Sequence, residues 1–234
     1  MFKLLSTANP KIQKGTKMGY LSFILHLAPA DLSGRETCPK RTAGCTAACL
    51  NTAGRGGMFK RGENTNMIQK ARIRKTNYFF NDRDAFMLDL AKDICKAINF
   101  AAKKGLTPVF RLNGTSDISW EKYVVNGQGD NIFQMFPQVQ FYDYTKVLGR
   151  KVKHIPNYHL TFSKADGNDS DVAEALLQGM SVVAVYDRIP AGVPSADETD
   201  LRFLDPRGIM LGLKAKGPAK KDYSGFVIRL TEVA

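Results

Sequence analysis

The sequence predicts a parallel α/β fold, in which helices cover one sheet that closes into a full or partial β/α barrel. Segments typical of strands alternate with segments typical of helices along the 234 residues. The strand segments are continuous apolar runs, which is typical of strands that are buried on both faces. Hydrophobic residues make up 44% of the chain and charged residues 24%, so a packed core is expected.

The first strand is expected within residues 19–27, the apolar run GYLSFILHL. Residues 28–65 form a predicted loop with three cysteines and six glycines, a length that needs a reason in a compact domain. From Asn66 to about Lys104, apolar residues recur at intervals of three and four, which predicts helix. Asp82 and Asp84 are candidate helix caps, and Gly105 is the expected stop.

Further strands are expected at 109–112, 139–142, 158–162 and 181–186, with a short helix at 172–177. Beyond Asp187 the pattern weakens into an irregular C-terminal part, about 188–234, which keeps short apolar runs at 208–213 and 225–228. These segments fit a single α/β domain over residues 1–234.

The chain carries 34 Lys and Arg against 22 Asp and Glu, a net charge of +12. This excess is compatible with nucleic acid or with a phosphorylated or other anionic ligand, and a solvated surface is the alternative. No apolar run is long enough to cross a membrane or act as a signal, so we expect a cytoplasmic protein with no membrane partner. Thiols stay reduced in that compartment, where clustered cysteines more often bind metal than form disulfides.

Cys38, Cys45 and Cys49 lie within twelve residues, in the segment CPKRTAGCTAAC. Thiolates are soft ligands that suit iron-sulfur clusters and zinc. Structural zinc sites usually take four ligands from paired elements, and only one close pair exists here. The segment therefore predicts a metal centre, with a [4Fe-4S] cluster as the first interpretation and with zinc or three unpaired thiols as alternatives.

A fourth protein ligand would have to come from elsewhere, and the candidates are His26, Cys95, His154 and His159. Cys95 lies between Ile94 and Ala97 in the predicted helix, where we expect a small buried thiol. His26 lies near the end of the strand that leads into the loop, where a hydrogen-bonded core histidine is the alternative. Three cysteines without an obvious fourth ligand suit a four-iron cluster with one iron open to another ligand.

In parallel α/β folds, functional sites lie at the carboxyl ends of the strands. Polar side chains follow three predicted strands there, and we take them as candidate cofactor-binding residues: Asn113, Gly114, Thr115, Ser116 and Asp117, then Asp143, then Ser163. An Asx or ST turn with a helix cap would use most of the same residue types in the 113–117 segment, so this alternative stays open. The chain has no Walker loop, no G-x-S-x-G segment and no H-E-x-x-H segment.

The order of a strand, a three-cysteine loop and parallel β/α units resembles the core of radical S-adenosylmethionine enzymes. That resemblance implies a [4Fe-4S] cluster on the three thiolates, with S-adenosylmethionine on the open iron. It also implies that Asn113, Gly114 and Thr115 stand where the family meets the methionyl amino group, and that Ser163 or Asp166 stands where it meets the ribose. The family mostly uses C-x3-C-x2-C, so the x6/x3 spacing of this chain is a variant.

The segments RLNGTSDISWE, FYDYTK, LKAKG and SGFV resemble recurrent blocks of a bacteriophage family called gene product 88. The resemblance implies a phage-encoded protein that acts in the cytoplasm of an infected bacterium. Two functions follow as hypotheses. The first is an iron-sulfur enzyme of radical S-adenosylmethionine type. The second is a non-catalytic phage protein, held together by zinc or an iron-sulfur cluster, that binds nucleic acid or a host protein.

Overall fold

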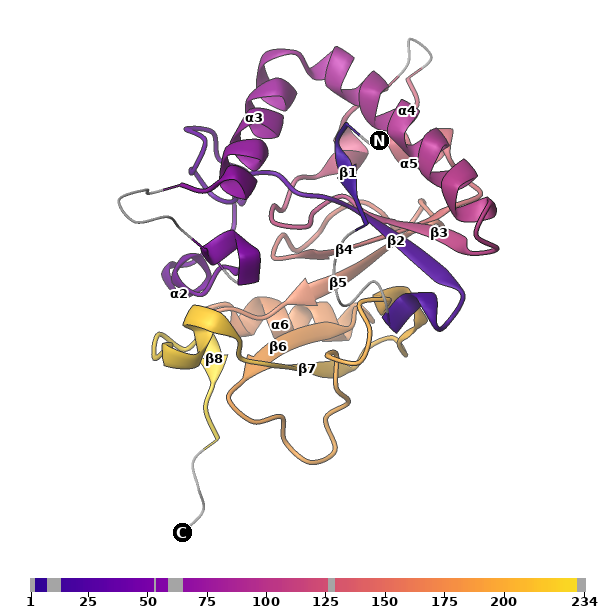
Figure 1. Ribbon diagram of the computed structural model, residues 1–234. Helices are drawn as coiled ribbons and strands as arrows, with labels where there is room; N and C mark the ends of the chain where they lie inside the picture. The colour runs from indigo at the N-terminus through magenta and orange to yellow at the C-terminus, as the bar shows by residue number, and fades with distance from the viewer. Residues whose placement is uncertain (1–2, 8–13, 53, 59–64, 126–128, 231–234) are drawn as a thin grey trace.

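A computed structural model describes residues 3–7, 14–52, 54–58, 65–125 and 129–230 (Figure 1). Its sheet contains eight strands: β1 (Leu5–Ser6), β2 (Tyr20–Leu25), β3 (Thr107–Arg111), β4 (Gln140–Thr145), β5 (Tyr158–Ser163), β6 (Val182–Tyr186), β7 (Met210–Lys214) and β8 (Val227–Ile228). The first seven lie side by side in chain order. Only β1 is antiparallel to its neighbour, so the prediction of a mostly parallel α/β fold is confirmed.

The two ends of this strand path, β1 and β7, do not pair with each other in the described part of the chain. The sheet is therefore not closed, and its curvature into a partial barrel stays a prediction. The short strand β1 was not predicted, because two residues carry no periodic signal. It is held instead by tertiary contacts, including the Leu4 amide, which donates to Asp93 Oδ2 over 2.7 Å.

The helical pattern between 66 and 104 forms two long helices, α3 (Met67–Asn81) and α4 (Arg83–Ala102). Asp82 separates them and caps α4, since its side chain accepts from the Ala85 amide over 3.2 Å. Gly105 follows α4 with a φ of +64°, a left-handed conformation in which glycine is not strained. The predicted cap and stop are thus confirmed.

The remaining helices are short. They are α2 (Ala43–Ala47), α5 (Ile132–Met135) and α6 (Asp169–Leu177), with 3-10 turns η1 (Leu50–Thr52), η2 (Gly54–Gly57), η3 (Trp120–Lys122), η4 (Arg202–Leu204) and η5 (Gly217–Lys221). None of the described helices is long and apolar enough to cross a membrane.

The main core lies between the sheet and the helices α3 and α4, where Phe23, Phe110 and Phe141 from successive strands are fully buried. A second cluster lies on the opposite face, where Val109 and Tyr142 contact Leu201. Leu201 immediately precedes η4, so part of the irregular C-terminal region covers the face of the sheet that α3 and α4 leave free. Figure 1 shows α3 and α4 together on one side of the sheet.

The edge of β6 that faces β5 is shared between two strands. Val182 and Val183 pair with β5, whereas Val185 and Tyr186 pair with β8. The end of β5 and the segment before β8 therefore meet at the carboxyl end of the sheet. The cysteine loop lies against this junction.

Candidate metal centre

The three clustered cysteines lie between β2 and α3, at the carboxyl end of the sheet. Cys45 is on α2, while Cys38 precedes this helix and Cys49 follows it. The short helix α2 forms because Thr42 caps it: the Thr42 hydroxyl accepts from the Cys45 amide over 3.1 Å. The expectation of a loop without regular structure is therefore corrected over this one turn and over η1 and η2.

Asp166, just past β5, attaches α2 to the sheet. Its Oδ2 accepts from the Gly44 amide over 3.1 Å, and its Oδ1 accepts from the Thr42 hydroxyl. A Cβ on Gly44 would lie 2.0 Å from Ser224 Oγ and 2.7 Å from Asp166 Oδ1. Only glycine permits this close approach, which brings the cysteine loop onto the β5–β8 junction.

The three thiols lie close enough for the charge of one to change the pKa of the next. Burial raises the pKa of Cys38 and of Cys49, and nearby thiols add to both effects: Cys49 raises the pKa of Cys38, and Cys45 raises that of Cys49. Two partly buried thiols with raised pKa values are protonated at neutral pH until a cation replaces their protons. A metal that binds here would therefore release protons.

Backbone N–H groups already point at two of the sulfur atoms. The Ala30 amide donates to Cys38 Sγ over 3.4 Å, and the Asn51 amide donates to Cys49 Sγ over 3.5 Å. Such bonds favour the thiolate form and lower the pKa of each thiol, against the larger effect of burial. Ala30 itself has a φ of +51°, which residues with a Cβ rarely adopt. This backbone is shaped around the Cys38 sulfur.

In the described ranges, no group of three His, Cys, Asp or Glu side chains is arranged to hold a single metal ion. A tetrahedral zinc with Zn–S bonds of about 2.3 Å needs sulfur atoms about 3.8 Å apart. A four-iron cluster binds each thiolate through a different iron, so its ligands stand farther apart. The donors are three neighbouring thiols, a soft ligand set that suits both iron-sulfur clusters and zinc.

The described residues contain no such group, so neither the three thiols nor any of the candidate fourth ligands belongs to one. Cys95 is exposed on α4, so the expectation of a buried thiol was wrong: Ile94 and Ala97 face the core, and residue 95 points away from it. His154 is exposed, and His159 lies near the start of β5, at the end away from the cysteines. His26 is largely buried, and its pKa falls to about 3 because of burial and the nearby Arg72 and Arg111.

The segment that follows β3 folds around the side chain of Asn113, and neither Ser116 nor Asp117 caps the next helical turn, η3, whose N-cap is Ser119. Asn113 Oδ1 accepts from Ser116 Oγ (2.9 Å), the Ile118 amide (2.9 Å) and Trp120 Nε1 (3.0 Å). Asn113 Nδ2 donates to the Ile118 carbonyl over 2.9 Å. All of these hydrogen bonds of the Asn113 side chain are to residues of its own loop. Trp120 is a fully buried core residue.

The same segment also contacts the end of β2 and the cysteine loop. The Gly114 amide donates to the Leu25 carbonyl (2.9 Å), and the Asp117 amide donates to the Thr37 carbonyl (2.8 Å). Thr115 Oγ1 donates to the Leu27 carbonyl over 2.5 Å, and the Thr115 carbonyl oxygen lies 4.0 Å from Cys38 Sγ. These contacts fix both sides of Cys38.

Asp143 lies inside β4 and not beyond it, because the strand continues to Thr145 through its pairing with β5. This corrects its predicted place at a strand end. Its carboxylate is fully buried and accepts from the Asn113 amide (2.7 Å) and from Tyr158 OH (3.0 Å). Burial raises the pKa of Asp143 to about 7. Asp143 thus contacts the 113–117 segment through the backbone amide of Asn113.

The last two candidates are Asp117, which contacts the residue after β4, and Ser163, which ends β5. Asp117 Oδ2 accepts from the Lys146 amide over 2.7 Å, and burial raises the pKa of Asp117. Ser163 is the last residue of β5, paired in register with Val183 of β6, and its carbonyl accepts from Asn168 Nδ2 over 3.1 Å.

Two cations near Cys49 were missed from the sequence. Arg72 of α3 and Lys146 beyond β4 both lower the pKa of Cys49. Arg72 also donates to Asn51, through its carbonyl (3.3 Å) and its Oδ1 (2.5 Å), which anchors the turn after Cys49. Neither cation forms an ion pair with a carboxylate in the described part of the chain, so their charge is available to thiolates. The signal was present in α3, whose sequence MIQKARIRKTNYFFN has four basic residues and no acidic one.

The family model for gene product 88 matches residues 3–230. The chain belongs to the gene product 88 family. This match includes every described strand, the cysteine loop and the 113–117 segment. No curated protein and no solved structure matches the chain.

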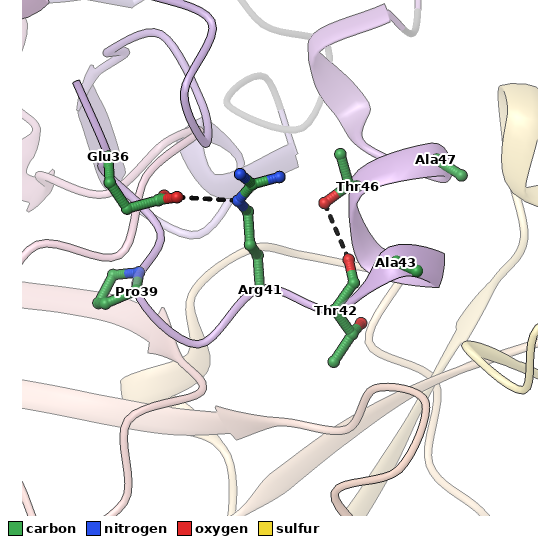
Figure 2. Close-up of a pocket in the computed structure, with 7 residues that line it drawn as sticks. All are labelled: Glu36, Pro39, Arg41, Thr42, Ala43, Thr46 and Ala47. Carbon is green, nitrogen blue, oxygen red and sulfur yellow. Dashed lines mark hydrogen bonds and ion pairs between the residues drawn. The ribbon is translucent and has the colours of Figure 1, made fainter. Parts of the chain in front are cut away.

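A shallow hollow of about 600 Å³ lies on the outer side of the cysteine loop (Figure 2). Its lining comes from residues 36–47, including Pro39, Thr42 and Thr46, and no cysteine is among the described residues that line it. Arg41 is one of the lining residues and is paired with Glu36 and Asp31, each at 2.9 Å. Its positive charge is therefore largely compensated.

Proposed function

We propose that Cys38, Cys45 and Cys49 hold a [4Fe-4S] cluster, and that this phage-family protein is an iron-sulfur enzyme of radical S-adenosylmethionine type, built on a partial β/α barrel, that acts in the host bacterial cytoplasm. The observation that carries the proposal is that three thiols, close enough for one to shift the pKa of the next, lie at the carboxyl end of a parallel sheet. A cluster on three thiolates has one iron open to a further ligand, and when bound it supplies electron transfer and a coordination site for S-adenosylmethionine.

The residues of the chain have distinct parts in this proposal. The amides of Ala30 and Asn51 stabilise two of the thiolates. Arg72 and Lys146 offset negative charge beside Cys49. Asp166 holds α2 in place from the end of β5. The loop that contacts Cys38 consists of Asn113, Gly114, Thr115, Ser116 and Asp117. Ser163 and Asp166 lie at and just past the end of β5, and they would meet the ribose if the resemblance to radical S-adenosylmethionine enzymes holds.

Anaerobic purification followed by cluster reconstitution tests the proposal. We expect about four iron and four sulfide per chain, with a broad visible absorption near 400 nm. Replacing Cys38, Cys45 or Cys49 by Ser should remove most of the iron. Cys95→Ser is the matched control, since Cys95 is an exposed thiol on α4, and it should keep its iron.

The outcomes separate the alternatives. One zinc per chain and no sulfide would favour a zinc protein, and neither metal would leave three free thiols. Addition of S-adenosylmethionine should change the electron paramagnetic resonance spectrum of the reduced cluster. A cluster that neither binds nor cleaves S-adenosylmethionine would remove the radical part of the proposal while keeping the iron-sulfur part.

A second candidate is non-catalytic binding of nucleic acid, or of a host protein, by the metal-stabilised chain. Helix α3 favours it, because Lys70 and Arg74 are exposed there on a helix without acidic residues. Binding of a labelled DNA or RNA should weaken as salt rises, and Lys70→Gln with Arg74→Gln should reduce the slope of log Kd against log salt by about two. Lys92→Gln with Lys96→Gln on α4 is the control. An unchanged slope would exclude α3 as the contact surface.

A further inference from the structure

A second candidate site lies near the start of β5, away from the cysteines. It is a cavity of about 170 Å³, here called the β5 cavity, lined by the segment between β4 and β5, by the turn after α6 and by Arg207 before β7. Pockets that hold drug-sized ligands measure about 300–1,000 Å³, so this one has room for a small molecule.

The charge of the β5 cavity is of one sign. Arg150, Lys153 and Arg207 line it, together with His159, and the described residues of the lining include no Asp or Glu. Lys153 and Arg207 are exposed and form no ion pair in the described structure. Arg150 is paired with Glu121 deeper in the protein, at 2.5 Å from Nη2 to Oε2, which fixes its guanidinium.

Two buried polar atoms of the lining residues have no hydrogen-bond partner. They are Arg150 Nη1 and His159 Nε2. Arg150 Nη1 lies 3.7 Å from Asp117 Oδ1 and so has an ion-pair partner, which leaves His159 Nε2 as the atom of this pair without a partner in the described structure. The rest of the lining is mainly apolar and includes Val152 and Leu160.

We propose that the β5 cavity binds a small organic oxyanion, whose carboxylate or phosphate group meets Lys153 and Arg207 while its body contacts the apolar lining. The proposal is independent of any cluster at the cysteines. The anion neutralises Lys153 and Arg207, which form no ion pair in the described structure, and its oxygen atoms accept from their N–H groups.

Isothermal titration calorimetry at low salt, with inorganic phosphate in one arm and benzoate in the other, tests the proposal on the full chain. We expect saturable 1:1 binding of at least one probe. Tighter binding of phosphate would assign a phosphate ligand, and tighter binding of benzoate would assign a carboxylate on an apolar body. Lys153→Gln with Arg207→Gln should raise the Kd by about tenfold or more, since each substitution removes a hydrogen bond to a charged group.

Lys17→Gln with Lys103→Gln is the matched control. Both lysines are exposed and outside the cavity, so the net charge falls equally while the Kd should stay within about twofold of the unsubstituted protein. Circular dichroism checks that both double variants are folded, as expected for exposed positions. Equal affinity in the cavity variant and the unsubstituted protein, equal losses in both double variants, or no saturable binding of either probe would overturn the proposal.

Discussion

Asp143 is a buried carboxylate that should make the stability of this protein fall as pH rises. It is fully buried in β4 and accepts two hydrogen bonds, from the Asn113 amide and from Tyr158 OH. Burial raises its pKa to about 7 from the ordinary value of 3.8, despite these bonds and the nearby Arg111. The substitution Asp143→Asn keeps the size of the side chain, keeps an acceptor for the Asn113 amide and removes the titration.

The sign and size of the effect follow from proton linkage. Between about pH 4 and pH 7 the folded chain holds a proton on Asp143 that the unfolded chain has released. The free energy of unfolding therefore falls with pH in this window, by about 1.4 kcal/mol per pH unit from this one residue, and the full shift corresponds to on the order of 4 kcal/mol. Above about pH 8 this contribution is constant.

Urea unfolding of the unsubstituted protein and of Asp143→Asn at pH 5, 6, 7 and 8 measures the effect, because other titrating groups cancel in the difference. The difference in unfolding free energy should move in favour of the variant by about 2 kcal/mol between pH 5 and pH 7, then level off above pH 8. A difference that stays constant over this range would refute the reasoning, since it would mean that Asp143 ionises equally easily in the folded and unfolded chains.

Two further predictions concern the attachment of α2. Gly44→Ala should displace α2, because the new Cβ would lie 2.0 Å from Ser224 Oγ, and iron should be lost to a chelator at least about tenfold faster; an unchanged loss rate would show that the loop can adjust. Asp166→Ala removes two hydrogen bonds and should lower the unfolding free energy by about 1–2 kcal/mol. The control Asp169→Ala, which removes an exposed carboxylate paired only with Lys164, should cost less than about 0.5 kcal/mol. Equal effects of the two substitutions would contradict the role assigned to Asp166.

The sequence was informative where local signals and burial agree. Continuous apolar runs located the strands from β2 to β6, and a capping aspartate located the break between α3 and α4. The strands β7 and β8 lie in the part that was expected to be irregular, where only short apolar runs were noted. The strand β1 and the turn η4 were not predictable, since both depend on tertiary contacts such as Leu4 with Asp93 and Leu201 with Tyr142. The end of β4 was placed too early because polar Asp143 looked like a strand end, although the buried hydrogen bonds of Asn113 and Tyr158 satisfy it.

The candidate site was predictable in part for a similar reason. The cysteine triplet and the polar 113–117 segment are local patterns, and the rule of strand ends placed them at the same edge of the sheet. The attachment by Asp166 and Gly44 spans more than a hundred residues. Such a contact requires the fold, as does the approach of Arg72 and Lys146 to Cys49.

Iron and acid-labile sulfide analysis of anaerobically prepared protein, with a visible spectrum, tests the central claim most directly. A [4Fe-4S] cluster on Cys38, Cys45 and Cys49 predicts about four iron and four sulfide per chain in the unsubstituted protein and in Cys95→Ser, and a large loss when any of the three is replaced by Ser. A colourless protein after reconstitution, without iron or sulfide, would contradict it.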